Sequence, residues 1–255
     1  MANWSDPQFG ARPSSTATAT GVAVDAGLRA HMLRVYNYMA SAVLLTGIIA
    51  VLVGNTNMVY SLISYNALTN TLSPSALGWI VTFAPLVVVF WLMLGINRIS
   101  TGMAQFLFWT YAVLLGASFS TIFLVYTGAS IALTFAATAA GFASLSLYGY
   151  TTKRDLSGLG TFLLMGLVGL FVAMIVSMFL PEEVNRTMSL VIAAAGVLIF
   201  AGLTAYDTQK VKSLYFQVAG SDVIGKAAIL GALTLYLDFI NMFFFLLQFL
   251  GNSRD

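Results

Sequence analysis

Two aspartates, Asp207 and Asp238, are the residues of this sequence whose type and position indicate chemistry. Both lie in strongly apolar stretches: Asp238 is the only charged residue between Ala227 and Leu250, and Asp207 lies near the end of the stretch 188–208. An aspartate at the centre of a membrane helix costs about 2.5–3.5 kcal/mol on insertion scales, and such residues usually face the bundle interior and mark a functional pathway. We therefore interpret both as candidate functional residues.

The two carboxyl groups can form a proton-dependent pair if their helices place them at the same depth. Two carboxylates cannot both ionise cheaply in a dry site, so a touching pair should share one proton. The shared proton ties the two helices together, whereas a doubly charged pair repels and opens a path or admits a cation. Two plainer interpretations stay open: water and Lys210 solvate an interfacial Asp207, and Asp238 only bonds to a neighbouring helix.

Other polar residues follow the same face as Asp238. Thr234 lies about one turn before it and Asn241 about one turn after it, so the three form one stripe on a helix whose other faces are apolar. This stripe predicts that the last helix packs inside the others, although such groups can also simply hold helices together. Arg98, at the inner end of the second apolar stretch, is a candidate counter-charge for the pair or an anchor at the membrane interface.

The helices that must carry these residues are membrane helices. The chain has 255 residues, of which 59% are hydrophobic and 8% charged, whereas ordinary soluble domains are roughly a quarter charged. A soluble globular protein is therefore excluded, and no alternating barrel pattern is visible. About 20 apolar residues are needed to cross the bilayer, and the sequence predicts an all-α protein with seven such spans: 35–54, 79–96, 104–126, 129–150, 159–180, 188–208 and 227–249.

We expect the chain to divide into three regions. Residues 1–30, rich in Ser, Thr and Ala, are predicted to be a disordered polar tail, residues 31–250 the membrane domain, and residues 251–255 a short C-terminal tail. The start of the chain has no signal-peptide pattern, so the first span is expected to act as an uncleaved insertion signal. A long loop is predicted from Lys210 to Lys226. Whether the last span crosses fully or is re-entrant stays open.

Composition also excludes several classes of chemistry. The chain has no cysteine and one histidine, which removes disulfides, thiolate metal sites and imidazole clusters. Its net charge of +2 is too small for a nucleic-acid footprint. We expect no bound cofactor, no nucleic-acid partner and no enzyme activity. The expected partner is the lipid bilayer.

The distribution of basic residues predicts the orientation. With the N-terminus in the cytoplasm, nine lysines and arginines fall on the inner side and two, Arg186 and Arg254, on the outer side. This split follows the positive-inside rule and supports both the direction and the number of spans. Short loops without appended domains favour a bacterial inner membrane. The nine inner residues are Arg12, Arg29, Arg34, Arg98, Lys153, Arg154, Lys210, Lys212 and Lys226.

Three segments resemble a known family. The stretches around the aspartates, Ala201–Lys210 (AGLTAYDTQK) and Leu233–Phe243 (LTLYLDFINMF), resemble signature stretches of the transmembrane Bax inhibitor motif family, and Leu33–Met39 (LRVYNYM) resembles its first helix. The similarity spans residues 30 to 250. It implies a seven-helix fold in which the other six helices wrap the last one. It also implies a pH-sensitive calcium leak that an aspartate pair governs.

Within this resemblance, Asp207 and Asp238 match the aspartate pair, and Arg98 matches a basic position between the second and third spans. Here the second and third spans hold no carboxylate, whereas some relatives have one near the pore. The aspartate pair and the polar stripe of the last span make a passive, proton-gated cation pathway the leading hypothesis, and the resemblance implies Ca²⁺ or protons as the permeating or gating ions.

Three other functions compete with this pathway. A regulator that binds another membrane protein, such as a protease or a death-signalling factor, is the alternative. An intramembrane aspartyl protease is disfavoured because Tyr236-Leu237, and not glycines, precede Asp238. A retinal protein is disfavoured because the last span has no internal lysine.

Overall fold

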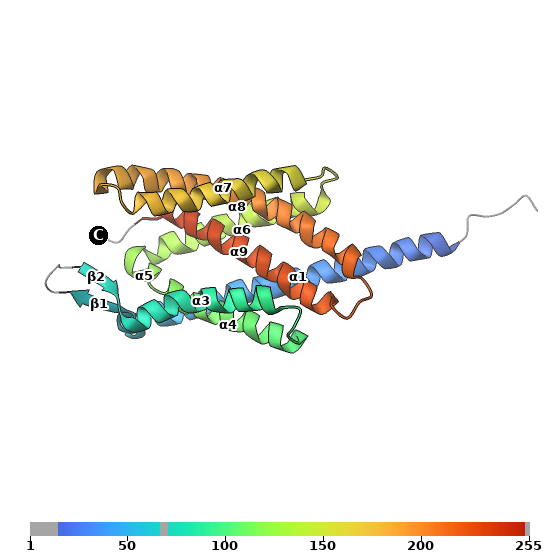
Figure 1. Cartoon of the computed structure of the whole chain (residues 1–255), viewed down its shortest axis with the longest axis horizontal. Coiled ribbons are helices and arrows are strands. Elements are labelled where there is room, and N and C mark those ends of the chain that lie inside the picture. The colour runs from blue at the N-terminus through green and yellow to red at the C-terminus, as the bar shows by residue number, and fades with distance from the viewer. Residues whose placement is uncertain (1–14, 67–70, 253–255) are drawn as a thin grey trace, which may run out of the picture.

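The computed structural model describes residues 15–66 and 71–252. In that part of the chain, nine helices and one two-stranded hairpin follow one another (Figure 1). The elements are α1 (Ser15–Gly54), α2 (Met58–Ser61), β1 (Ile63–Asn66), β2 (Thr71–Pro74), α3 (Ala76–Gly95), α4 (Thr101–Phe119), α5 (Ile122–Val125), α6 (Gly128–Thr151), α7 (Ser157–Ser177), α8 (Glu182–Val218) and α9 (Ile224–Leu250). Strands β1 and β2 pair antiparallel, with Ile63 opposite Pro74.

Seven segments of these helices are long and apolar enough to cross a membrane. They are Asp25–Gly54 of α1, α3, the α4–α5 segment Thr101–Val125, α6, α7, Val184–Val218 of α8, and α9. The predicted all-α class and the predicted number of spans are confirmed. The short hairpin β1–β2 falls in the connection between the first two spans, outside the apolar stretches.

Helix α9 is the central element of the bundle. About two thirds (67%) of its most apolar window is buried, against 17–39% for the other six spans. It packs against α8, α1, α6 and α4. Figure 1 shows it between one layer formed by α1, α3 and α4 and another formed by α6, α7 and α8. The predicted interior position of the last span is confirmed, because small residues such as Ala228, Gly231 and Ala232 let its neighbours approach.

The first helix begins earlier than the sequence predicts. Residues 15–30 were expected to belong to a disordered tail, but α1 already begins at Ser15. From Leu28 onward tertiary contact stabilises the helix, because the side chains of Leu28 and His31 are buried and the His31 ring lies 5.5 Å from the ring of Tyr215 in α8. The predicted tail residues 1–14 lie outside the described part of the chain.

Helix α8 is also longer than the sequence predicts. The expected loop from Lys210 to Lys226 is wrong, because α8 continues to Val218 and only residues 219–223 connect it to α9. Val211 and Tyr215, one turn apart, are both buried, whereas Lys210 is exposed. The segment is therefore an amphipathic helix that extends the apolar one. A turn with Gly220 at φ +78° ends it, a conformation that favours glycine.

The turns alternate between two ends of the bundle. The α3–α4, α6–α7 and α8–α9 turns lie at the same end as the start of α1, and the hairpin, the α7–α8 turn and the C-terminus lie at the other (Figure 1). In the predicted C-terminal tail, Asn252 is tied to the start of α6, because its N–H donates to Ser130 Oγ at 3.0 Å and its carbonyl accepts from the N–H of Thr127 at 3.2 Å. Residues 253–255 lie outside the described part.

Candidate functional site

The antiparallel hairpin of α8 and α9 brings the two aspartates to a similar depth. Asp207 lies 11 residues before Val218, and Asp238 lies 14 residues after Ile224. At 1.5 Å per residue, these positions are about 16 and 21 Å from the connecting turn, a difference of one helical turn. The extension of α8 to Val218 produces this match. Had α8 ended near residue 208, Asp207 would lie at the helix end.

The carboxyl groups of Asp207 and Asp238 are hydrogen-bonded to each other. Both side chains are buried, with exposed fractions of 8% and 4%. A hydrogen bond between two carboxyl groups requires a proton on one of them, because an ionised carboxylate only accepts. The arrangement is therefore a carboxylic acid that donates to a carboxylate, in a site that water barely reaches.

The surroundings of the pair provide few alternative partners. Oδ2 of Asp238 is buried and receives no hydrogen bond from a donor group among the described residues. The neighbouring hydroxyl groups of Thr204 and Thr208 donate to carbonyl groups of their own helix, at 2.8 and 2.7 Å. Lys210, one turn beyond Asp207, is the cation whose charge attracts both carboxylates. The protonation state of the pair thus depends on burial, on mutual repulsion and on Lys210.

The other predicted site residues are not drawn into this contact. Thr234 Oγ1 donates to the carbonyl of Leu230 at 3.1 Å, and Asn241 Nδ2 donates to the carbonyl of Leu237 at 2.8 Å, so both bond within α9. The candidate counter-charge Arg98 is exposed in the α3–α4 turn. Lys210 lies on α8 itself, and its charge acts on both carboxyl groups, so it has the role of a counter-charge.

Sequence reasoning missed a side chain that fixes α8 against the α6–α7 turn. Gln209 Oε1 accepts from the N–H of Leu156 at 2.9 Å, and its Nε2 donates to the carbonyl of Arg154 at 2.8 Å. One amide therefore serves as both acceptor and donor for the backbone of the turn. Gln209 was visible beside Asp207 in the sequence, but nothing there indicates which turn it meets.

A chain of hydroxyl groups was missed as well. Tyr36 of α1 shares a 2.6 Å hydrogen bond with Ser146 of α6, and Ser146 shares one of 2.9 Å with Thr208 of α8. The chain joins three helices directly beside Asp207. Isolated hydroxyl residues are common in membrane helices, so the sequence carries no signal that singles out these three.

Seven apolar spans, of which the last is central and carries a buried aspartate, define a multi-pass integral membrane protein. The family model described as "Inhibitor of apoptosis-promoting Bax1" matches residues 28–255. The chain therefore belongs to the Bax inhibitor family, and the resemblance found in its sequence is confirmed.

Bacterial relatives match over nearly their whole length. The chain is 44% identical to protein RP147 of Rickettsia prowazekii over 241 residues, which cover 94% of this chain and 97% of the relative. It is 44% identical to the inner membrane protein YbhL of Escherichia coli K12 over 231 residues, 90% and 94% of the two chains. A Caulobacter vibrioides protein is 42% identical over 243 residues, 95% and 96% of the two chains.

Proposed function

We propose that this protein is a passive cation leak, with Ca²⁺ as the conducted ion, and that protonation of the Asp207–Asp238 pair gates it. The observation that supports the proposal is the hydrogen bond between two buried carboxyl groups on adjacent helices. Ionisable groups inside a membrane bundle are costly and mark ion or proton pathways. A pair that only held helices together would need no titratable group, since hydroxyl and amide groups already do this elsewhere in the bundle.

The gate has two states that differ by one proton. With one proton shared, the pair ties α8 to α9 through a charge-assisted hydrogen bond. When that proton leaves, two negative charges remain in a poorly solvated site, where their repulsion is much stronger than in water. The helices then separate, or a cation enters between the carboxylates. Hard cations such as Ca²⁺ prefer carboxylate oxygens, which is why calcium fits the proposal.

We further propose a bacterial inner membrane location with the N-terminus in the cytoplasm. The relative YbhL is described as an inner membrane protein. The basic residues in the α3–α4 and α6–α7 turns, and in the adjoining ends of α8 and α9, support this orientation. Lys210, and through it the aspartate pair, would then sit toward the cytoplasmic end of the bundle.

Flux from liposomes tests the gate. Full-length protein is reconstituted in vesicles with a calcium indicator inside, and Ca²⁺ entry is followed at pH 5.5 to 8.5 for the wild type, Asp207→Asn and Asp238→Asn. Asp222→Asn, in the exposed α8–α9 turn, is the matched control. We expect a pH-dependent flux in the wild type and the control, and a flux independent of pH in both site variants. Equal profiles for all four proteins would exclude the gate.

A second candidate is a regulator that binds another membrane protein without conducting ions. The family description, which names inhibition of a partner, favours it. This function predicts no flux above empty vesicles at any pH, together with a specific membrane protein crosslinked to the chain in native membranes. The flux measurement therefore separates the two functions before any partner is known.

A further inference from the structure

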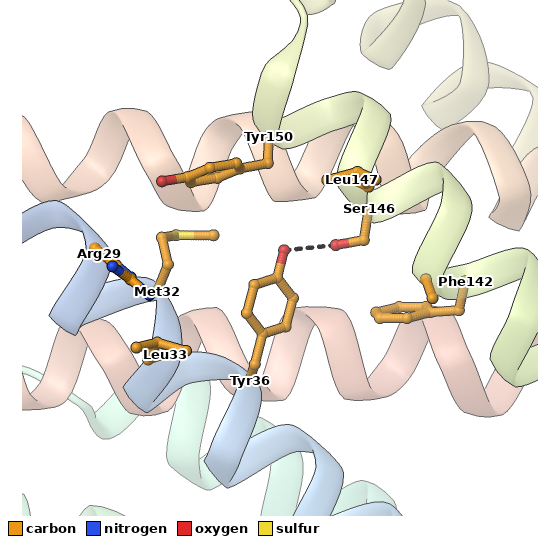
Figure 2. A pocket seen from close by; sticks show the side chains of 9 residues that line it. Arg29, Met32, Leu33, Tyr36, Phe142, Ser146, Leu147 and Tyr150 are labelled. Atoms are coloured by element: carbon orange, nitrogen blue, oxygen red, sulfur yellow. Dashed lines mark hydrogen bonds between the residues drawn. The ribbon is translucent and has the colours of Figure 1, made fainter. Parts of the chain in front are cut away.

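A cavity of about 490 Å³ lies between α1 and α6, apart from the aspartate pair. Figure 2 shows its lining: Tyr36 reaches from α1 to Ser146 on α6, and Tyr150 lies across the space from Met32. Neither aspartate lines it. Its volume is in the range of small-molecule and lipid sites, about 300–1,000 Å³. The cavity belongs to the bundle end that carries the start of α1.

One end of this cavity is cationic. Arg29 lines it and is exposed, and no carboxylate in the described part of the chain pairs with Arg29. Tyr150 lines it too, and the Lys212 ammonium lies 5.0 Å from the Tyr150 ring centre while donating to the Tyr150 carbonyl at 2.8 Å. No lining residue is acidic. This combination of charges complements an anion.

The remainder of the lining is apolar and continues along the same pair of helices. Leu33, Ala143 and Leu147 line the first cavity and are exposed at the rim of the bundle. A second cavity of about 540 Å³ is lined by α1 from Val43 onward and by α6 around Phe135, almost entirely with apolar side chains. Val43 lies seven positions after Tyr36, about 10 Å along the helix. An extended hydrocarbon chain is long enough to reach from one cavity into the other.

We propose that the groove between α1 and α6 is a binding site for an anionic phospholipid. Its phosphate binds Arg29, with the Tyr150 hydroxyl as a second donor, and one acyl chain lies along Leu33 and Ala143 toward the second cavity. Basic pockets between membrane helices bind anionic headgroups in this way. A free anion would use only the charged end and would leave the apolar groove unexplained. This site is independent of the proposed gate, since its test measures binding and not flux.

Native mass spectrometry of the full-length, delipidated protein in detergent tests the headgroup. Phosphatidylglycerol and phosphatidylcholine with identical acyl chains are titrated separately. We expect at least tenfold tighter binding of phosphatidylglycerol to the wild type, and loss of this preference in Arg29→Gln. Arg98→Gln, which removes an exposed arginine of the α3–α4 turn, is the matched control and should keep the preference. Equal affinity of the wild type for both lipids, or equal behaviour of the two variants, would overturn the proposal.

A second pair of variants tests the acyl groove and does not depend on charge. Ala143→Phe places a ring in the cavity lining, whereas Ala140→Phe places one on an exposed position of the same helix outside the lining. Ala143→Phe should weaken phosphatidylglycerol binding at least tenfold, and Ala140→Phe should leave it unchanged. Glycerol phosphate in excess serves as a probe without acyl chains. Complete displacement of the lipid by glycerol phosphate would identify a free-anion site and refute the lipid proposal.

Discussion

Thr46 of α1 and Tyr236 of α9 share a 2.6 Å hydrogen bond in the fully buried centre of the bundle. Thr46 Oγ1 also donates to the carbonyl of Ala112 in α4, at 2.9 Å. Because the threonine has one hydroxyl proton, the Tyr236 hydroxyl must be the donor in the shorter bond. Two hydroxyl groups thus connect the central helix with α1 and α4. Tyr236 lies two residues before Asp238 on α9.

Removing the Tyr236 hydroxyl should destabilise the bundle, while the aromatic ring that fills the space is kept. Polar bonds between membrane helices contribute about 0.6 kcal/mol on average and up to about 1.7, so we expect Tyr236→Phe to lower the free energy of unfolding by about 1 kcal/mol. Thermal unfolding in detergent measures the loss. Tyr148→Phe, at an exposed position of α6, is the control and should unfold like the wild type. An unchanged melting temperature for Tyr236→Phe would contradict the prediction.

Gly149 fixes the closeness of α6 and α8. A Cβ at this position would come within 2.9 Å of the carbonyl carbon of Ala205, a backbone atom that cannot rotate away. Gly149→Ala should therefore push the helices apart and cost about 2 kcal/mol or more, the size expected for overpacking. Gly141→Ala on the same helix has open space around its Cβ and should be neutral or slightly stabilising. Equal stability of the two variants would show that α6 and α8 tolerate the separation.

Lys210 should set the position of the flux profile on the pH axis. Its positive charge favours the doubly ionised state of the aspartate pair, so Lys210→Gln makes the loss of the last proton harder. The profile should then move to higher pH, by a few tenths of a unit, because Lys210 is exposed and solvent screens its charge. Arg98→Gln changes charge by the same amount at the α3–α4 turn. A larger shift for Arg98→Gln than for Lys210→Gln would restore Arg98 as the counter-charge.

Asp155, in the α6–α7 turn outside the spans, should titrate below the ordinary aspartate value. Hydrogen bonds from the Ser157 hydroxyl and from the Ser157 N–H, the latter 2.9 Å from Oδ1, lower the pKa of Asp155. The ionised carboxylate therefore stabilises the turn above its ordinary pKa of about 3.9, and this stabilisation is lost as pH falls through the lowered pKa. Carbon-detected NMR measures the midpoint. Ser157→Ala should raise it, and an unchanged midpoint would contradict the assignment.

Much of the fold follows from local patterns, but the end of α8 and the start of α1 were predicted wrongly. The apolar stretch around Asp238 predicts a helix with an interior polar face, and α9 is that helix. The same method ends α8 near Thr208 and starts α1 after residue 30. Each extended segment carries a buried ring, Tyr215 in α8 and His31 in α1, and the two rings pack against each other. A contact between residues 184 positions apart cannot be inferred from either segment alone.

The amino-acid sequence by itself determined that lipid surrounds most of the chain, how many spans it has and which two acids are buried. Each of these follows from transfer of single residues or single helices into lipid, which depends only on local composition. Tertiary structure decided that Asp207 and Asp238 meet, that Lys210 and not Arg98 is the nearby cation, and that Tyr36, Ser146 and Thr208 form one chain. These contacts depend on the length and register of packed helices, and packing is a property of the whole bundle.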